Sequence, residues 1–348
     1  MRLKAFVCLL SAIFVAAAAP APPPAEMLLG PPSGDELRAI RGLVHAGSIA
    51  EATRRLARIA DSRTLYDLRM LREFEPLWND PVAQTYLRPE DFASRHVAAA
   101  RAKAEREPRD LHQQSNLLEV LLINSRYSEI VSSARETLSR LSSYGSNPEA
   151  EGWVRNNLAE ALHFLGDYDA AAEAIRPVVR AATRRDAYLG NFSINYGLMS
   201  LRHGNYNEAR YAARLATRGP ITDYARSLIR YTDACALHGL GRDREAEKAL
   251  NAMLASSGQT PSVTFDALLC FDRLDQAADV LVRMLADERL RARALRKLQG
   301  CTDHPMLPQS IREEHAKILA LRDRPEVRRA IDAVAVIVDR PDLCGGVG

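Results

Sequence analysis

The sequence of 348 residues predicts an all-α fold built from stacked antiparallel helix pairs, and three observations carry this prediction. Three segments align without gaps around Gly166, Gly204 and Gly241, which are 38 and 37 residues apart. A small residue stands seven positions before each glycine, and an alanine stands five positions after it. These small residues are Ala159, Gly197 and Ala234 before the turns, and Ala171, Ala209 and Ala246 after them. No run alternates with the period of a β-strand, so each segment predicts two close helices joined by a left-handed glycine turn, and such pairs must stack into a solenoid.

The chain begins with the features of a secretory signal. Residues 1–4 carry two positive charges, residues 5–15 form an apolar run, and residues 16–19 are alanines. We expect cleavage after Ala18, because a cut after Ala19 would place Pro20 beside the scissile bond. Residues 1–18 are therefore the predicted signal peptide, and bacterial periplasm is the predicted location; an uncleaved anchor is the alternative. No later window approaches the roughly 20 apolar residues of a spanning helix, so we expect no stable membrane insertion.

The remaining elements are expected in the following order. Residues 19–34, rich in Pro and Ala, predict an extended linker. Residues 35–88 predict an N-terminal helical hairpin and a connecting helix from Ser62 to Phe74, which ends where two prolines break the helical pattern. The repeat array is expected over 89–256. Residues 257–340 predict C-terminal helical repeats, with last helices near 309–321 and 325–338, and residues 341–348 predict a disordered tail.

Two of the aligned segments carry a family resemblance. Residues 153–175 read WVRNNLAEALHFLGDYDAAAEAI, and residues 195–209 read NYGLMSLRHGNYNEA. They resemble tetratricopeptide repeats, and a weaker resemblance extends to 45–52, 125–130 and 272–277, although the last two lack the turn glycine. The resemblance implies a right-handed superhelical solenoid of antiparallel helix pairs. It also implies a concave groove, lined by the first helix of each pair, that binds a protein or peptide.

One polar pattern on the first helices predicts a binding surface. Asn116, Asn157 and Asn195 each stand nine residues before the turn position. An asparagine side chain offers two donors and an acceptor, so a ladder of them can bind the backbone of an extended peptide. Asparagines at the equivalent place face the groove in long tetratricopeptide superhelices, which the resemblance extends to this chain. The alternative is that the three asparagines agree by chance or cap neighbouring turns.

Further groove residues are predicted from the same register. Glu119 and Glu160 stand six residues before the turn, and His163 and His238 stand three before it. The other side chains expected on this side are Trp153, Tyr231 and Arg202. Together they predict a mixed groove suited to a peptide with a basic or apolar side chain. The alternative is a solvated helix face, with Trp153 packed between repeats.

The sequence offers little enzyme chemistry. It contains no HExxH, GxSxG, CxxC or phosphate-binding glycine loop, so we expect no enzymatic activity and no cofactor. The eight histidines are dispersed, and those near successive turns would be roughly 10 Å apart, too far to share one metal ion. We therefore expect no metal site.

The cysteines predict a disulfide in an exported chain. Cleavage of the signal removes one of the five cysteines and leaves Cys235, Cys270, Cys301 and Cys344. Cys270 with Cys301 is the favoured pair, because the break at residues 301–305 could fold back on the preceding hairpin. Cys235 is expected to pack as a buried thiol, whereas Cys344 either bridges to another cysteine or stays free.

Composition narrows the function classes. The chain has 47 basic and 44 acidic side chains, a formal charge of +3 that falls to +1 when the signal is removed. Such a balance argues against a nucleic-acid partner. We therefore expect a non-enzymatic scaffold that binds a protein or peptide in its groove, as a periplasmic adaptor or assembly factor; the prediction specifies no oligomeric state. The alternative is a small-molecule or catalytic role in the flanking helices, near Trp78 or near Cys301 and His304.

Overall fold

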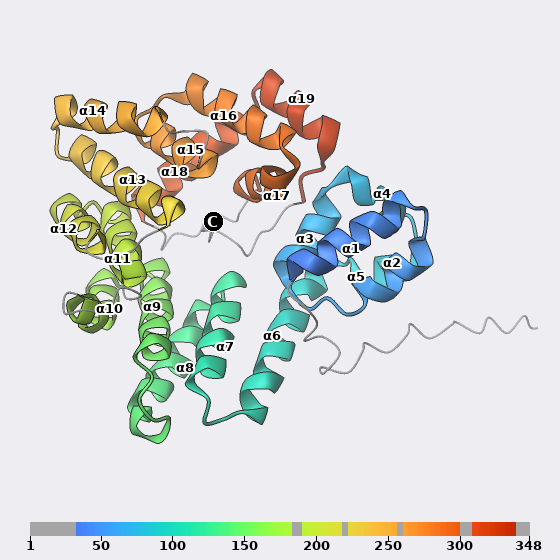
Figure 1. The fold of residues 1–348 in the computed structure, drawn as a ribbon, viewed down its shortest axis with the longest axis horizontal. Helices are drawn as coiled ribbons and strands as arrows, with labels where there is room; N and C mark the ends of the chain where they lie inside the picture. Colours follow the sequence, from blue (N-terminus) through green and yellow to red (C-terminus); the bar gives the residue numbers. More distant parts are fainter. Residues whose placement is uncertain (1–32, 183–189, 218–221, 256–259, 300–307, 339–348) are drawn as a thin grey trace, which may run out of the picture.

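The computed structural model describes residues 33–182, 190–217, 222–255, 260–299 and 308–338 (Figure 1). The predicted signal peptide, most of the predicted linker, the predicted tail, Cys301, His304 and Cys344 lie outside these residues. Regular structure in the described ranges is helical, apart from isolated bridge residues such as the pair Leu71 and Ala335, so the all-α prediction is confirmed. No helix in these ranges is both long enough and apolar enough to cross a membrane.

The N-terminal helices form one end of the fold. They are α1 (Ser33–His45), α2 (Ile49–Leu56), α3 (Ser62–Met70), the 3₁₀ turn η2 (Arg72–Phe74), α4 (Glu75–Trp78), α5 (Pro81–Tyr86) and α6 (Pro89–Arg106). The carboxylate of Asp61 begins α3 by accepting hydrogen bonds from the backbone N–H groups of Arg63 and Thr64. The predicted connecting helix ends before Phe74, because Leu71 adopts an extended backbone and pairs with Ala335.

Five helix pairs follow in chain order. They are α7 (Leu111–Ile123) with α8 (Tyr127–Ser139), α9 (Pro148–Phe164) with α10 (Tyr168–Ala182), α11 (Gly190–Arg202) with α12 (Tyr206–Ala216), α13 (Asp223–Gly239) with α14 (Asp243–Leu254), and α15 (Pro261–Cys270) with α16 (Leu274–Ala286); the 3₁₀ turn η3 (Leu141–Ser143) follows α8. Figure 1 shows the helices along a curved path, with the first helix of each pair toward the centre and the second outside. The inner side is therefore lined by α7, α9, α11, α13 and α15.

The turns within the pairs repeat one backbone conformation. Among the described residues, those with positive φ are Gly47 (73°), Ser125 (55°), Gly166 (83°), Gly204 (82°), Gly241 (68°) and Asp272 (54°), together with Gly145 (76°) outside the pairs. The N–H after each turn residue bonds to a carbonyl five residues earlier, as in Asp167 to Leu162 and Arg126 to Leu121, both 2.9 Å. The predicted left-handed turns are confirmed. Ser125 and Asp272 keep the same turn without a glycine.

The small residues around the turns allow close helix contact. A Cβ placed on Gly197 would lie 3.4 Å from the carbonyl oxygen of Ala209 on α12 and 3.4 Å from Cγ2 of Thr232 on α13. The alanines at the matching places, including Ala159 and Ala234, are fully buried. Larger side chains there would push the helices apart.

The C-terminal helices return to the N-terminal ones. They are α17 (Glu288–Lys297), α18 (Gln309–Arg322) and α19 (Pro325–Val334). One hydrophobic core contains residues of both ends, among them Ile40 and Phe92 from the first helices and Leu281, Leu295 and Ile331 from the last. The backbone N–H of Val336 also donates to the carbonyl of Met70 at 2.8 Å. The path of helices therefore closes on itself, so the described parts of residues 35–88 and 257–340 share one core.

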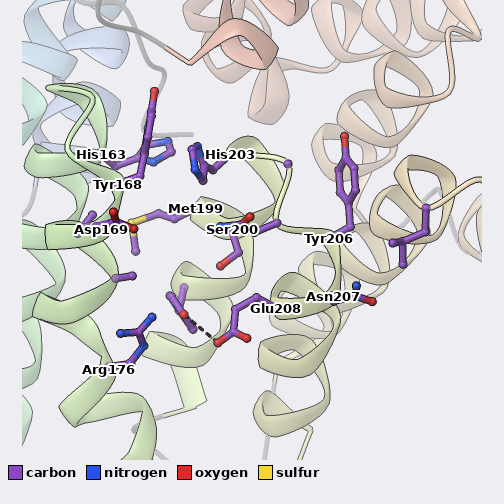
Figure 2. Close-up of a pocket in the computed structure, with 16 residues that line it drawn as sticks. His163, Tyr168, Asp169, Arg176, Met199, Ser200, His203, Tyr206, Asn207 and Glu208 are labelled. Carbon is purple, nitrogen blue, oxygen red and sulfur yellow. Dashed lines mark hydrogen bonds between the residues drawn. The ribbon is translucent and has the colours of Figure 1, made fainter.

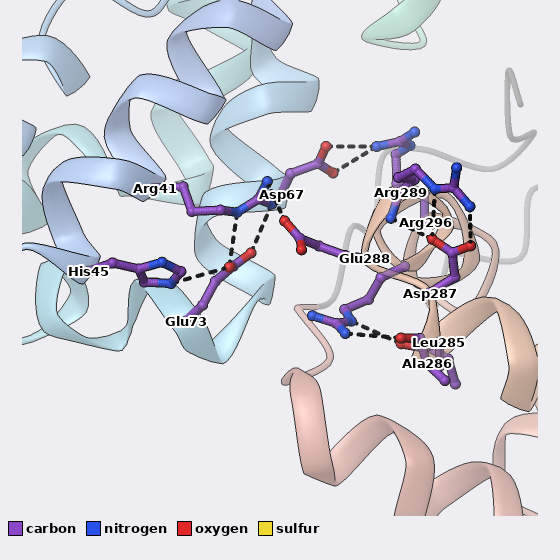
Figure 3. A network of polar contacts seen from close by, with 11 residues as sticks. Arg41, His45, Asp67, Glu73, Leu285, Ala286, Asp287, Glu288, Arg289 and Arg296 are labelled. Atoms are coloured by element: carbon purple, nitrogen blue, oxygen red, sulfur yellow. Dashed lines mark hydrogen bonds and ion pairs between the residues drawn. The ribbon is translucent and has the colours of Figure 1, made fainter.

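Ion pairs join the N-terminal helices to α17 at this junction (Figure 3). The guanidinium of Arg41 on α1 binds Glu73 at 2.9 Å and Glu288 of α17 at 2.8 Å. Nη1 of Arg296 on α17 lies 2.8 Å from both carboxylate oxygens of Asp67 on α3. The basic residues of α17 thus bind acids, carbonyls and one hydroxyl of the protein itself.

The structure corrects the predicted disulfide. Cys270 is bonded to Cys235 on α13, with their Cα atoms 6.1 Å apart. The two residues are close because α13 and α15 are inner helices of consecutive pairs, packed side by side. Cys270 is thus not free for Cys301, and Cys235 is buried as a half-cystine and not as the expected thiol.

Candidate functional site

The inner face carries a band of ionisable side chains, which we call the inner band. Its members are Arg63 of α3, Glu119 of α7, Glu160 of α9, Arg202 of α11, Tyr231 of α13, Asp266 of α15 and Glu314 of α18. Neighbours in the band act on one another electrostatically. The charge of Glu119 influences the pKa of both Arg63 and Glu160, and that of Arg202 influences the pKa of Glu160, Tyr231 and Glu314. Successive inner helices therefore place one charged or phenolic group each around a common space.

Glu160 is the best-defined acid of the band. Burial raises its pKa, whereas a hydrogen bond from Asn156 and the charge of Arg202 lower it, and the charge of Glu119 raises it. Nδ2 of Asn156 donates to Oε1 of Glu160 at 2.8 Å, and Nδ2 of Asn195 donates to Oδ1 of Asn156 at 2.9 Å. This chain of hydrogen bonds fixes the carboxyl of Glu160 from α11 through α9.

Arg202 is the basic side chain that lies near the acids of the band. The Arg202 side chain is half-buried, and its guanidinium forms no ion pair within 4 Å in the described part of the chain. Its positive charge lowers the pKa of Glu160, of Glu314 and of the phenol of Tyr231. A half-buried guanidinium without a bidentate acid can form charge-assisted hydrogen bonds with a carboxylate of a ligand.

Tyr231 contributes a neutral polar group. Burial raises its pKa well above 10, and the charges of Glu314 and Asp266 raise it further, while that of Arg202 lowers it. The phenol therefore stays protonated near neutral pH and can donate a hydrogen bond, but it is not a nucleophile there.

The expected asparagine ladder is corrected. Asn157 is 3% exposed and donates to the carbonyl of Ser115 on α7 at 3.4 Å. Asn195 donates to Asn156 on α9, as described, and Asn116 is exposed and contacts Gln113 of its own helix. The place nine residues before the turn faces the preceding inner helix, so Asn157 and Asn195 join neighbouring helices.

The predicted groove histidines also lie elsewhere. His163 is 2% exposed at the turn edge, where its ring makes edge contacts with Phe164 and Tyr168. Burial, followed by the charges of Arg202 and His203, lowers the pKa of His163 to about 3, and its Nε2 has no hydrogen-bond partner among the described residues. His238 is exposed and stacks on Phe271 at a ring distance of 4.7 Å. The place three residues before the turn is at the end of the inner helix, so His163 packs against rings beside its own turn and His238 stacks on a ring beside the next one.

The structure therefore brings together four of the predicted groove residues, namely Glu119, Glu160, Arg202 and Tyr231. The other predicted aromatic, Trp153, packs its ring against Phe192 of α11, as the alternative interpretation expected. Sequence reasoning missed Arg63, Asp266 and Glu314. Asp266 could have been found, since it stands six residues before Asp272, in the register of Glu119 and Glu160. Arg63 and Glu314 come from the flanks and share no register with the band.

A second feature is a cleft between α10 and α12 (Figure 2). Its volume is about 450 Å³, and its walls include Tyr168, Arg176, His203 and Glu208. Tyr168 stacks on His203 at a ring distance of 3.9 Å. On the floor, the phenol of Tyr196 donates to Glu208 at 2.8 Å. The stacked rings of Tyr168 and His203 therefore join two helix pairs, whereas the partly buried hydrogen bond of Tyr196 joins α11 to α12 within one pair.

One serine, histidine and aspartate group resembles a catalytic triad in composition alone. Ser62 Oγ lies 3.1 Å from Nδ1 of His96, and Asp61 and Asn124 approach the same nitrogen at 3.9 and 3.4 Å. A triad requires the serine and the acid on opposite ring nitrogens. Here the backbone N–H of Ser62 also donates to Nδ1, at 3.3 Å, so this nitrogen is an acceptor and the group links α3, α6 and α7.

Trp78, near which the alternative function was expected, has a structural role. Its indole N–H donates to the carbonyl of Leu68 at 2.8 Å, and the guanidinium of Arg69 lies over its ring at 5.1 Å. No group of three or more His, Cys, Asp and Glu side chains in the described ranges is arranged to hold a metal ion. A scan against protein-family models found no match, and searches of curated proteins and of solved structures found none either.

Proposed function

We propose that this protein is a non-enzymatic scaffold that binds a peptide or protein segment along its inner face. In this proposal the helix pairs form a right-handed superhelical solenoid of the tetratricopeptide type. The six identical left-handed turns and the buried small residues around them support this assignment, because they are what a repeated close-packed hairpin requires.

The observation that carries the proposal is the state of Arg202. Its half-buried guanidinium lies among Glu160, Glu314 and Tyr231 without an ion pair in the described part of the chain. Structural arginines of this protein, such as Arg296 and Arg41, bind their acids at 2.8 to 2.9 Å. Arg202 and the acids beside it therefore keep hydrogen-bonding capacity for a partner.

Export to the bacterial periplasm is part of the same proposal. The charged and apolar start of the sequence supports it, as does the bond between Cys235 and Cys270, because disulfides persist mainly in oxidising compartments. N-terminal sequencing of the chain after expression in a Gram-negative host tests this part. A mature chain that begins at residue 19 is expected, whereas recovery of the intact first residues in the cytoplasm would overturn it.

A peptide library tests binding at the inner face. Mature protein is immobilised and used to select from random displayed peptides, and the enriched peptides are then measured against variants. Arg202→Ala and Glu160→Gln are expected to weaken binding at least tenfold. Arg244→Ala, an exposed arginine on the outer helix α14, is the matched control and should bind like the wild type. No enrichment, or equal binding by all variants, would refute the proposal.

A further inference from the structure

Helix α18 divides into two halves with different surroundings. Ile318 and Leu321 in its C-terminal half are 8% and 1% exposed and belong to the core shared by both ends of the chain. In the half from Gln309 to Lys317 no side chain is fully buried. The C-terminal half is therefore anchored by apolar burial, whereas the N-terminal half lacks such an anchor.

The N-terminal half nevertheless lies on the inner face. Ser310 donates its hydroxyl hydrogen to the carbonyl oxygen of Arg202, and Ile311 packs against the apolar core of the central helix pairs. Glu314 stands among Arg202, Lys297 and Lys317, with Asp266 nearby. Ser310 and Glu314 therefore lie beside Arg202 of the inner band, whereas Ile311 lies on the apolar surface next to the band.

The contacts of α18 have a helical spacing. Ile311, Glu314 and Ile318 stand at i, i+3 and i+7, so an apolar, an acidic and an apolar side chain follow one face of the helix. Lys317 extends this face, since its ammonium donates to the carbonyl of Leu269 at 3.2 Å and pairs with Asp272. The inner face opposite it offers apolar surface, the Arg202 guanidinium and a carboxylate, in that order.

We propose that the partner of the inner face is a helix that presents a carboxylate to Arg202, and that the N-terminal half of α18 is a displaceable occupant of the same surface. This inference rests on the proposed function and adds the conformation and chemistry of the partner. A partner helix with an apolar side chain at i and an acidic one at i+3 replaces Ile311 and Glu314. The C-terminal half of α18 stays in the core and keeps the displaced half tethered.

The sequence of α18 itself provides the probe. A fluorescein-labelled peptide of residues 309–322 is titrated into the full mature chain and into its Ile311→Asp variant, with fluorescence anisotropy as the readout. The variant should bind the peptide at least tenfold more tightly than the wild type does, because its own occupant is weakened. Adding Arg202→Ala should reduce this binding at least tenfold, and adding Arg244→Ala should leave it unchanged.

Controls separate the outcomes. A peptide with Glu314→Lys should bind at least tenfold more weakly, and circular dichroism checks that each variant is folded. Should Ile311→Asp not fold, Ser310→Ala repeats the comparison, because it removes only the hydroxyl contact with Arg202. The displacement proposal would be overturned if wild type and the Ile311→Asp variant bind the peptide equally, or if Arg202→Ala leaves peptide binding unchanged. If the displacement proposal fails but library-selected peptides still require Arg202 for binding, the scaffold function stands without displacement of α18. If those peptides do not require Arg202, both proposals fail.

Discussion

Arg296 of α17 holds Asp67 of α3 with one guanidinium nitrogen 2.8 Å from each carboxylate oxygen, across 229 residues of sequence. Both side chains are mostly buried, at 27% and 10% exposed. The pair lies where the last helices meet the first ones, at the edge of the shared core (Figure 3). It is therefore one of the contacts that turn a curved row of helices into a closed path.

Loss of one partner of this pair should destabilise the whole fold. Asp67→Ala leaves the Arg296 guanidinium without its acid, and such changes cost about 3 kcal/mol when the pair is buried. Urea unfolding of both single variants and the double variant measures the coupling. The exposed pair of Arg242 and Glu245 is the matched control, with a coupling of about 0.3 kcal/mol. A coupling for Asp67 and Arg296 as small as that of the control would contradict a structural role at the junction.

The disulfide predicts a redox-dependent stability. Cys235→Ala with Cys270→Ala opens a loop closed across 35 residues, which should lower the free energy of unfolding by roughly 4 kcal/mol by the loop-entropy estimate. Peptide mapping under non-reducing conditions identifies the bonded pair directly. Cys344→Ala is the control and should leave the linked peptide unchanged. A peptide that joins Cys270 to Cys301 would restore the pairing expected from sequence and refute the one in the structure.

The non-glycine turns offer a stabilising substitution. Ser125 holds φ at 55°, where a Cβ costs about 1 kcal/mol, and its hydroxyl accepts a hydrogen bond from Tyr127 at 3.2 Å. Ser125→Gly should therefore raise the free energy of unfolding by about 0.5 kcal/mol, while Gly204→Ala should lower it by about 1 kcal/mol. Thermal unfolding compares the two. Stabilisation by both changes, or by neither, would show that the backbone conformation is not what limits these turns.

His163 predicts a loss of stability at acidic pH. Its pKa is lowered to about 3 by burial, whereas the unfolded chain titrates near 6.5, so the unfolded state binds the proton first as pH falls. Stability should fall from about pH 6.5 downward through this residue, and His163→Phe should remove that component and the unpaired Nε2. Urea unfolding at pH 8 and pH 5 checks this prediction. The variant should gain on the wild type by more at pH 5 than at pH 8, and an equal difference at both values would contradict it.

Much of the helical frame followed from sequence, because its signals are local. The last-helix prediction at 309–321 agrees with α18 (Gln309–Arg322). The turn at Gly166 was predictable because glycine reaches a left-handed conformation that most residues avoid. The side-chain predictions were weaker. Glu160 and Arg202 share the inner band as expected, but Asn157 and His163 are buried between neighbouring units.

Most helix starts, turns and pairings could be predicted from local residues, since caps, turn glycines and small residues act over a few positions. Tertiary structure decided which way each register position faces, because that depends on the tilt of the neighbouring helix. It also decided the junction of Asp67 with Arg296, the bond of Cys235 with Cys270 and the approach of Glu314 to Arg202. Such contacts join distant segments through closure of the whole path, and no local pattern encodes the distance over which the path closes.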